Sequence, residues 1–342
     1  MDLYINTLNN KQLLSSFNFA RNSDLVYSEV VSKEEFKKID NNNLLVISED
    51  DNYIFYKVKS FSISENMVVF TNLFCIDALF EELYKLKNFR NIKIVTHQSD
   101  LPITKNIFLK KPNCVSEWYS INAKYKTKDL IPIPIGLSNV HYSKNLTKEH
   151  FSKIKPLAFN NKIEKLYVNF EVNTNFNERY KLIKFFKNKS WAEVETNKLS
   201  LDNYLHNLNK YKYILCPPGN GLDTHRMWET LYAESIPVIN NNYTYSSASN
   251  LATFKIDNFF KLSIKNLNEY QYKTISKDQL NIDYWFKKIR KNLIPNNQEE
   301  LCINESDKKQ KDVISKYHED LDKIKRIKKL KTFERKIKKR IF

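Results

Sequence analysis

The chain has 342 residues, of which 42% are hydrophobic and 28% charged, and its net charge is +17 at pH 7. This balance excludes a largely disordered protein, the length allows two domains with their own cores, and no apolar run is long enough for a transmembrane helix. The charge is uneven, because residues 308–342 hold 15 Lys/Arg against 5 Asp/Glu.

The first half of the chain alternates short apolar runs with segments of helical spacing. We expect strands at residues 25–27, 44–47, 67–70 and 92–95, because short apolar runs of this kind suit buried strands. A helix is expected over residues 74–86. Strand, helix and strand within about 30 residues indicate the βαβ unit of a parallel sheet.

A proline segment, IPIPIGL at residues 131–137, follows and cannot be helical. We interpret it as an extended structural segment with a turn at Gly136, and we place the connection between domains after it, around residues 139–161. The four cysteines are far apart and form no CxxC pair, and the N-terminus MDLYINTLNN has no features of a secretory signal. Both observations favour reduced thiols and a cytoplasmic protein.

The second half restarts the same alternation. The expected strands and helices are, in chain order, a strand at 165–170, a helix at 177–188, a strand at 191–194, a helix at 201–208, a strand at 213–216, a helix at 224–234, a strand at 236–239 and a helix at 280–292. The sequence therefore predicts an α/β fold with an N-terminal domain over residues 1–145, a C-terminal domain over 146–305 and a basic C-terminal helix over 306–342.

Glycine is rare in this chain. There are three glycines, where average composition would give about 24, so each is expected where a side chain is not tolerated. One is Gly136. The other two, Gly219 and Gly221, lie in the segment CPPGNGLDTHRMWETLYAESIPVIN, residues 216–240.

This segment has the chemistry of a diphosphate site. Pro217 and Pro218 end a strand, the glycines allow close backbone approach, and Asp223 or Thr224 can cap the helix that follows. The free N–H groups and positive dipole of a helix N-terminus bind anions, and Arg226 in the first turn can hold a phosphate. Glu229, three residues later on the same face, is suited to a ribose diol. The alternative is a glycine turn followed by an exposed Arg–Glu ion pair.

The same segment resembles the nucleotide-sugar motif of exostosin-like glycosyltransferases, roughly PxGxGxDxxRxWEALxxGxIPV. It departs from that motif at Ala233-Glu234-Ser235, where the family usually has a small residue or glycine. A looser similarity extends over residues 92–240. The resemblance implies a GT-B-like arrangement of two Rossmann-like lobes, with the donor bound mainly by the C-terminal lobe. It implies a hexosyl- or pentosyltransferase in which Arg226 would meet the donor diphosphate and Glu229 the ribose. The residues that we expect at the donor site are Arg179, Pro218, Gly219, Asn220, Gly221, Asp223, His225, Arg226 and Glu229.

Catalysis needs a base and a group that stabilises the leaving diphosphate. His97 and Asp100 follow the strand at 92–95 and are the candidates for a base facing the cleft; the alternative is a polar loop in which Ser99 or Asp100 caps the next segment. Arg226 would stabilise the departing charge. Arg179 is either a second phosphate contact or a surface residue.

An acidic cluster, Glu49-Asp50-Asp51, resembles the metal-binding carboxylates of GT-A glycosyltransferases. A solvated loop is the alternative, since no second acidic site is evident. We therefore expect no essential metal and no other cofactor, with the nucleotide sugar as a substrate.

The C-terminal segment has apolar residues at steps of three and four among lysines and arginines, which suits an anionic membrane surface. Packing on the protein or in a coiled coil is the alternative. These apolar positions are Ile314, Tyr317, Leu321, Ile324, Ile327, Leu330, Phe333, Ile337 and Ile341.

The sequence thus predicts an inverting glycosyltransferase of polysaccharide or glycoconjugate synthesis. Its expected partners are a nucleotide sugar and a saccharide or lipid-linked glycan acceptor, and it would lie in the cytoplasm with a peripheral membrane contact. Two rival hypotheses are a catalytically inactive glycan-binding or scaffold module, and a nucleic-acid-binding protein that uses the basic segment. Nucleic acid is not expected, because no RRM, zinc-finger or helix-turn-helix signature is present.

Overall fold

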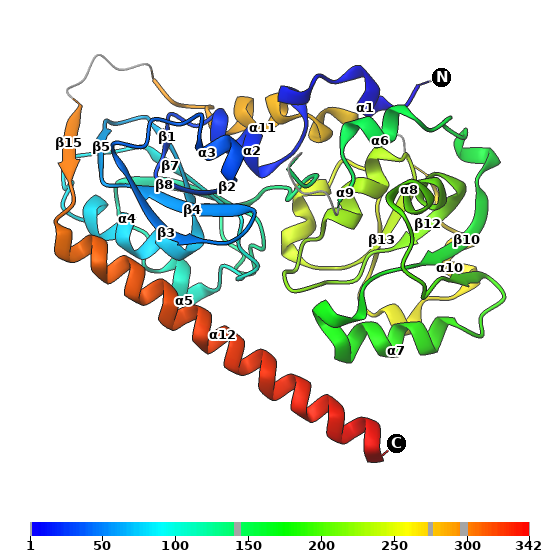
Figure 1. Ribbon diagram of the computed structural model, residues 1–342. Coiled ribbons are helices and arrows are strands. Elements are labelled where there is room, and N and C mark those ends of the chain that lie inside the picture. Colours follow the sequence, from blue (N-terminus) through cyan, green and yellow to red (C-terminus); the bar gives the residue numbers. More distant parts are fainter. Residues whose placement is uncertain (1, 140–144, 273–275, 295–299, 342) are drawn as a thin grey trace.

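A computed structural model describes residues 2–139, 145–272, 276–294 and 300–341, with side chains up to residue 327. Two five-stranded parallel sheets form the centres of two lobes that lie side by side (Figure 1). The predicted α/β fold class with two Rossmann-like lobes is confirmed. The residue ranges of the domains stay a prediction. The first residues of the chain pack against the C-terminal lobe, and residues 301–304 pair with a strand of the N-terminal lobe.

The N-terminal sheet has the strand order β1-β6-β7-β8-β9, and each neighbouring pair is parallel. Helix α4, Ile76–Leu83, joins β6 to β7 and completes the predicted βαβ unit. These strands are β1 (Leu25–Val26), β6 (Val68–Asn72), β7 (Ile92–His97), β8 (Val115–Ser120) and β9 (Leu130–Pro132).

A second sheet in this lobe is antiparallel, with the order β2-β4-β3. The strand predicted at residues 44–47 belongs to it as β3, Leu44–Glu49, so its assignment to a βα alternation was wrong. The reason is the short connection to β4, Tyr53–Val58, because parallel strands need a crossover of a dozen or more residues. The third strand is β2, Ser28–Ser32.

The C-terminal sheet has the order β11-β10-β12-β13-β14, again all parallel. From β10 the chain first adds β11 on one side and then β12 on the other side, so the order of strand addition reverses between β10 and β12. Open α/β sheets bind ligands outside the carboxyl ends of the strands at such a switch point. The strands are β10 (Ile163–Val168), β11 (Ala192–Val194), β12 (Tyr211–Leu215), β13 (Ile236–Asn240) and β14 (Phe254–Ile256); the connecting helices are α7 (Phe176–Phe186), α8 (Leu201–Lys210) and α9 (His225–Tyr232).

The largest hydrophobic core continues from one lobe into the other. It contains Leu14 and Phe19 near the N-terminus together with Trp228 of α9 and Trp285 of α11 (Ile282–Ile289), all buried. The hydroxyl of Tyr232 links these parts, because it accepts a hydrogen bond from Leu14 N and donates to Leu280 O. The bridging helices are α1 (Tyr4–Thr7), α2 (Ser16–Arg21) and α11 (Ile282–Ile289), which lie along the top of Figure 1.

The predicted connection at residues 139–161 is only partly described, since residues 140–144 lie outside the described part. The rest contributes to the core: α6, Lys148–Ser152, buries Phe151, and Leu146 is also buried. The remaining short helices are α3 (Lys33–Phe36), α5 (Lys105–Phe108) and α10 (Ile264–Asn268).

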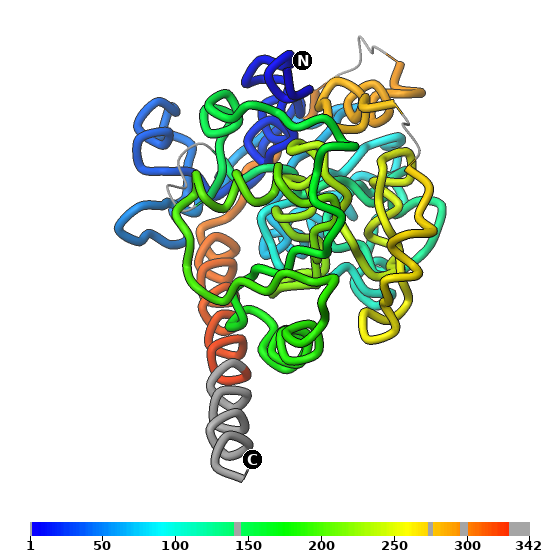
Figure 2. Tube along the Cα trace, turned by 90° about the vertical axis from the view of Figure 1, so that its right-hand side faces the viewer, coloured from blue at the N-terminus to red at the C-terminus, as the bar shows by residue number. Residues whose placement is uncertain are grey.

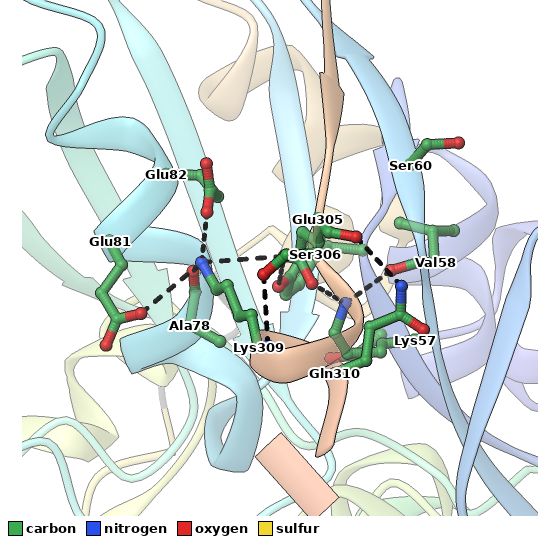
Figure 3. A network of polar contacts seen from close by, with 12 residues as sticks. Lys57, Val58, Ser60, Ala78, Glu81, Glu82, Glu305, Ser306, Lys309 and Gln310 are labelled. Atoms are coloured by element: carbon green, nitrogen blue, oxygen red, sulfur yellow. Dashed lines mark hydrogen bonds and ion pairs between the residues drawn. The ribbon is translucent and has the colours of Figure 1, made fainter. Parts of the chain in front are cut away.

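The C-terminal part of the chain returns to the N-terminal lobe. Strand β15, Leu301–Asn304, pairs antiparallel with β5, Ser60–Ile63. Glu305 then enters a buried polar network (Figure 3), where it accepts hydrogen bonds from Lys57 Nζ at 2.5 Å and Tyr27 Oη at 2.6 Å. Burial lowers the pKa of Lys57, and the adjacent carboxylate opposes this effect.

Helix α12, Asp307–Ile341, starts in the same network and runs past the lobe (Figures 1 and 2). Its first turns pack on the lobe: Lys309 Nζ lies 2.5 Å from Glu82, and the Tyr317 ring contacts Phe55 and Phe74. The first apolar positions of the helix therefore pack within the chain. Ile327 is 51% exposed. The side chains of Leu330, Phe333, Ile337 and Ile341 lie outside the described part, where the membrane-contact prediction is untested.

Among the described residues, none of the helices combines the length and apolarity needed to cross a membrane.

The buried Lys57–Glu305 pair makes a stability prediction. Glu305→Gln leaves Lys57 without a counter-charge in a site where both side chains are fully buried, so we expect a loss of about 3–5 kcal/mol in the free energy of unfolding. Urea denaturation measures it. Glu81→Gln is the matched control, because Glu81 is 67% exposed and 3.5 Å from Lys309. Equal stability of the two variants would contradict the prediction.

Candidate active site

Two cavities meet where the carboxyl ends of the two parallel sheets face each other. The larger, about 790 Å³, opens mainly on the C-terminal lobe, and the smaller, about 550 Å³, on the N-terminal lobe. Five residues line both cavities: Asp100, Ile135, Asn145, Asn220 and His225. The glycine segment predicted as a diphosphate site lies at this junction.

Arg179 of α7 binds the backbone of the loop between β12 and α9 through hydrogen bonds. Its guanidinium donates to Pro217 O and Pro218 O, each at 3.0 Å, and also to Glu171 O and Thr174 Oγ1. Gly219 fits closely over it, because a Cβ there would lie 3.1 Å from Arg179 Nη2. The predicted phosphate contact by Arg179 is untested, but the observed contacts are those of a residue that positions the loop.

Burial, with Arg226 nearby as a second cause, lowers the pKa of Arg179 to about 10. Two guanidinium groups therefore lie close together beside the larger cavity. Neither forms an ion pair with a carboxylate in the described ranges.

Gly221 allows the loop to dock on the N-terminal lobe. A Cβ at this position would lie 2.9 Å from Asn122 Nδ2, which follows β8. Asn122 uses both ends of its amide: Oδ1 accepts from Asp223 N at 2.8 Å, and Nδ2 donates to Ser99 O at 3.0 Å. A side chain at residue 221 would displace this amide and both of its hydrogen bonds.

Neither Asp223 nor Thr224, the two predicted caps, caps α9 with its side chain: Thr224 occupies the N-cap position but makes no side-chain capping bond. The Asp223 carboxylate instead accepts from Ile135 N of the opposite lobe at 2.9 Å, from Thr224 N at 2.9 Å and from Trp228 Nε1 at 3.0 Å. Burial raises the pKa of Asp223 to about 6, although these hydrogen bonds oppose the rise. Because no side chain caps the helix, its first N–H groups stay available to a ligand.

Arg226 lies in the first turn of α9 and lines the larger cavity. The Cζ atom of its guanidinium lies 5.0 Å from the centroid of the Tyr204 ring, in a cation–π contact. Two buried polar atoms here lack a hydrogen-bond partner within the described residues: Arg226 Nη1 and Thr224 Oγ1. Buried polar groups are nearly always paired in native proteins, so two unpaired donors beside one helix N-terminus indicate a missing acceptor.

Glu229 lies on the same face, one turn later, and is 5% exposed. It accepts a hydrogen bond from Tyr204 Oη at 2.8 Å, and burial raises the pKa of that phenol well above its usual value. Tyr204 thus lies between Arg226 and Glu229. The alternative of a direct Arg–Glu ion pair is not observed in the described part of the chain.

His225 connects the motif to the proline segment. Its Nδ1 lies 2.8 Å from Gly136 O, and since a carbonyl only accepts, Nδ1 carries the proton. Gly136 has φ +69°, and a Cβ there would lie 2.2 Å from Leu14 O. The third glycine is therefore required for the turn that presents this carbonyl.

The two predicted bases differ in what their contacts allow. His97 is buried; its Nδ1 accepts from Gln98 N at 2.9 Å and its Nε2 lies 3.3 Å from Pro134 O. Burial lowers the pKa of His97 to about 3. With both ring nitrogens occupied, His97 has no free nitrogen for an acceptor proton. Asp100 is exposed and lines both cavities.

The sequence of the C-terminal lobe and helix matches a known family model. The model is the RXYLT1 C-terminal domain, and the match covers residues 159–337, slightly more than half of the chain. The chain belongs to this family. It is an exostosin-like glycosyltransferase family, in agreement with the resemblance of residues 216–240.

Other comparisons add little to the family assignment. No curated protein matches the chain significantly. A UDP-GlcNAc 2-epimerase from Methanocaldococcus jannaschii is a structural neighbour with 10% identity, a TM-score of 0.25, and coverage of 72% of this chain and 76% of its own. A TM-score this low does not establish a common fold.

The acidic cluster of this RXYLT1-family chain forms a hairpin turn. Asp50 Oδ1 accepts from Asn52 N and Tyr53 N, both at 2.8 Å, and Glu49 pairs with Lys33. These contacts are those of a turn and a surface ion pair. No group of three or more potential metal ligands occurs among the described residues.

Sequence reasoning missed Tyr204 and Asn122, which complete the site of this family member. Tyr204 follows Leu201 by three residues on a predicted helix, and Asn122 ends an apolar strand segment. Neither position has a spacing that separates it from ordinary polar residues at element ends. Their roles become visible only when α8 and β8 are placed beside the glycine loop.

The raised pKa of Asp223 predicts a pH dependence of stability. Below about pH 4 the carboxyl is protonated in both the folded and the unfolded protein. As the pH rises to about 6, the unfolded chain loses this proton before the folded protein does. The contribution of Asp223 to the free energy of unfolding therefore falls, by about 3 kcal/mol in total. Urea denaturation of wild type and Asp223→Asn at pH 4 and pH 7 measures the change.

The free energy of unfolding of wild type minus that of Asp223→Asn should be larger at pH 4 than at pH 7. Asp202→Asn, at an exposed position of α8, serves as the control and should show no such trend. A difference that is the same at both pH values would contradict the shift.

Proposed function

We propose that this chain is an inverting GT-B glycosyltransferase that transfers xylose or another pentose or hexose from a nucleoside diphosphate donor to a saccharide hydroxyl. One observation carries the proposal: Arg226 Nη1 and Thr224 Oγ1 are buried and unpaired in the described structure at the uncapped start of α9. Both residues line the larger cavity.

A diphosphate is the ligand that satisfies this arrangement. Its oxygens can accept from the guanidinium, the hydroxyl and the free helix N–H groups together, and its negative charge offsets two neighbouring cations. Glu229 and Tyr204 lie one turn further along the cavity, where a ribose diol would be bound. The cavity is large enough for the rest of a nucleotide sugar.

The smaller cavity is the proposed acceptor site. Its lining is rich in hydroxyl and amide groups, such as Ser16, Gln98 and Asn139, which suit a polyhydroxylated saccharide or lipid-linked glycan. Transfer would occur at the junction, with Asp100 contacting the acceptor. Arg226 and the helix N-terminus stabilise the departing diphosphate, so the proposal needs no metal.

The rival hypotheses are less well supported. A nucleic-acid-binding role rests on α12 alone, whose first turns pack on the N-terminal lobe through Tyr317 and Lys309. An inactive glycan-binding module would not need unpaired donors in the donor cavity. We place the enzyme in the cytoplasm in polysaccharide or glycoconjugate synthesis, as part of the proposal.

The central prediction concerns Arg226. Arg226→Ala should lower sugar transfer by about 10²–10³-fold while the circular dichroism spectrum and melting temperature stay those of wild type, because it removes a charge that stabilises the leaving group. Transfer is measured with a panel of UDP-xylose, UDP-glucose, UDP-galactose, UDP-GlcNAc and GDP-mannose and a panel of glycan acceptors.

Arg90→Ala is the matched control. Arg90 is exposed, donates hydrogen bonds to the backbone carbonyls of Lys87 and Phe89 and lines neither cavity, so this variant should transfer at the wild-type rate. Near wild-type turnover by Arg226→Ala would overturn the assignment of the site. Wild-type binding of a nucleotide sugar without transfer or hydrolysis would favour the inactive module.

We also propose that α12 contacts an anionic membrane where a lipid-linked acceptor would lie. The helix runs past the N-terminal lobe, and its exposed Lys323, Lys325 and Arg326 can face a negative surface. Deletion of residues 321–342 should abolish co-sedimentation with phosphatidylglycerol vesicles and leave transfer to a soluble acceptor unchanged. Co-sedimentation that survives the deletion would refute the contact.

A further inference from the structure

We propose that His225, rather than His97 or Asp100, is the general base that takes the proton from the acceptor hydroxyl. The inference rests on the proposed function and goes beyond the sequence-based assignment of His225 to donor binding. It places the base in the C-terminal lobe, on the same helix turn as the residue that receives the leaving diphosphate.

A hydrogen bond to the proline segment orients the ring of His225. His225 Nδ1 donates to Gly136 O at 2.8 Å, which fixes the ring orientation, and Nε2 is then the nitrogen that can accept a proton in the neutral ring. In the described part of the chain, no side chain or carbonyl bonds to Nε2. A histidine oriented by a carbonyl through one nitrogen, with the other free to accept, is the arrangement that general-base catalysis uses.

His225 lies where the two cavities meet. His225 lines both cavities and is half-buried, at the start of α9. Its neighbour in sequence, Arg226, lines only the larger cavity. A hydroxyl bound in the smaller cavity can therefore reach His225 while attacking a sugar whose diphosphate lies against Arg226.

The other two candidates for the base, His97 and Asp100, differ from His225 in their surroundings. His97 uses Nδ1 and Nε2 for Gln98 N and Pro134 O. Asp100 is exposed on a loop and lines both cavities, so it is the rival candidate that the variants below must separate from His225. Of the two histidines, His225 is the one whose ring is held by one nitrogen while the other nitrogen can accept a proton.

Several titratable groups surround His225 and would influence its pH response. Asp223 and His97 interact with it electrostatically. Arg226 is adjacent in the same turn, and Asp100 borders both cavities. These neighbours include both signs of charge, so the loss of a limb of the pH profile in one variant and not in another identifies the group responsible.

In the proposed step, the acceptor oxygen forms a bond to the anomeric carbon while its proton moves to Nε2 of His225. The bond from the anomeric carbon to the diphosphate oxygen breaks, and its electron pair stays on that oxygen. The products are the glycoside, the nucleoside diphosphate with one more negative charge, and an imidazolium that then releases its proton to water.

The test uses His225→Asn in the full chain. The Asn side-chain amide can still donate to Gly136 O, so the loop should keep its position while the base is lost. We expect kcat to fall by about 10²–10⁴-fold, whereas the Kd for the active sugar nucleotide of the panel (UDP-xylose first), measured by calorimetry, should change by less than about twofold. The acid limb of the wild-type kcat/KM profile should disappear.

Two controls accompany this variant. His206→Asn, at an exposed position of α8, should leave both kcat and the pH profile unchanged. Asp100→Asn should raise the acceptor KM but retain the acid limb. If Asp100→Asn removes the limb and His225→Asn does not, Asp100 is the base and the inference is wrong.

The remaining outcomes are also decisive. A raised Kd for the sugar nucleotide with unchanged kcat in His225→Asn would make His225 a donor ligand and overturn its role as base. Absence of transfer by the wild-type protein itself would refute the proposed function, and the inference with it. Transfer by wild type and equal transfer by His225→Asn would refute the inference alone.

Discussion

The site depends on one buried carboxylate, that of Asp223. It accepts hydrogen bonds from Ile135 of one lobe and from Thr224 and Trp228 of the other, so the glycine loop, the start of α9 and the proline segment meet at a single side chain. Burial alone would make this carboxylate unfavourable, and the donors around it offset part of that cost. The position of Arg226 relative to the N-terminal lobe follows from this junction.

The three glycines make the same junction sterically possible. Gly219 lies over the guanidinium of Arg179, Gly221 lies against the Asn122 amide, and Gly136 forms a left-handed turn against Leu14. In each case a Cβ would meet atoms that belong to the loop support or to the opposite lobe. The three glycines of this glycine-poor chain therefore lie at positions where two segments approach so closely that a side chain has no room.

Much of the fold could be predicted from local pattern, because buried parallel strands and their helices are apolar runs of recognisable length. The strand β3 was expected within an alternation of strands and helices, but it lies in a separate antiparallel sheet. A single strand does not reveal its partner, and only the short turn at Asp50 imposes antiparallel pairing. At the site, the motif residues 219–229 could be found from spacing. The contacts of His97, Arg179 and Asp223 could not, because each depends on carbonyls or amides brought in from distant parts of the chain.

The exchange of chain ends has a consequence for how the protein is made. Residues near the N-terminus complete the core of the C-terminal lobe, while Glu305 completes the N-terminal lobe by neutralising Lys57, 248 positions earlier in the chain. On the ribosome, the first lobe to emerge lacks the carboxylate partner of Lys57 until Glu305 has been synthesised. Neither lobe has all of its buried contacts as an isolated fragment, so the two lobes and the cleft between them mature as one unit.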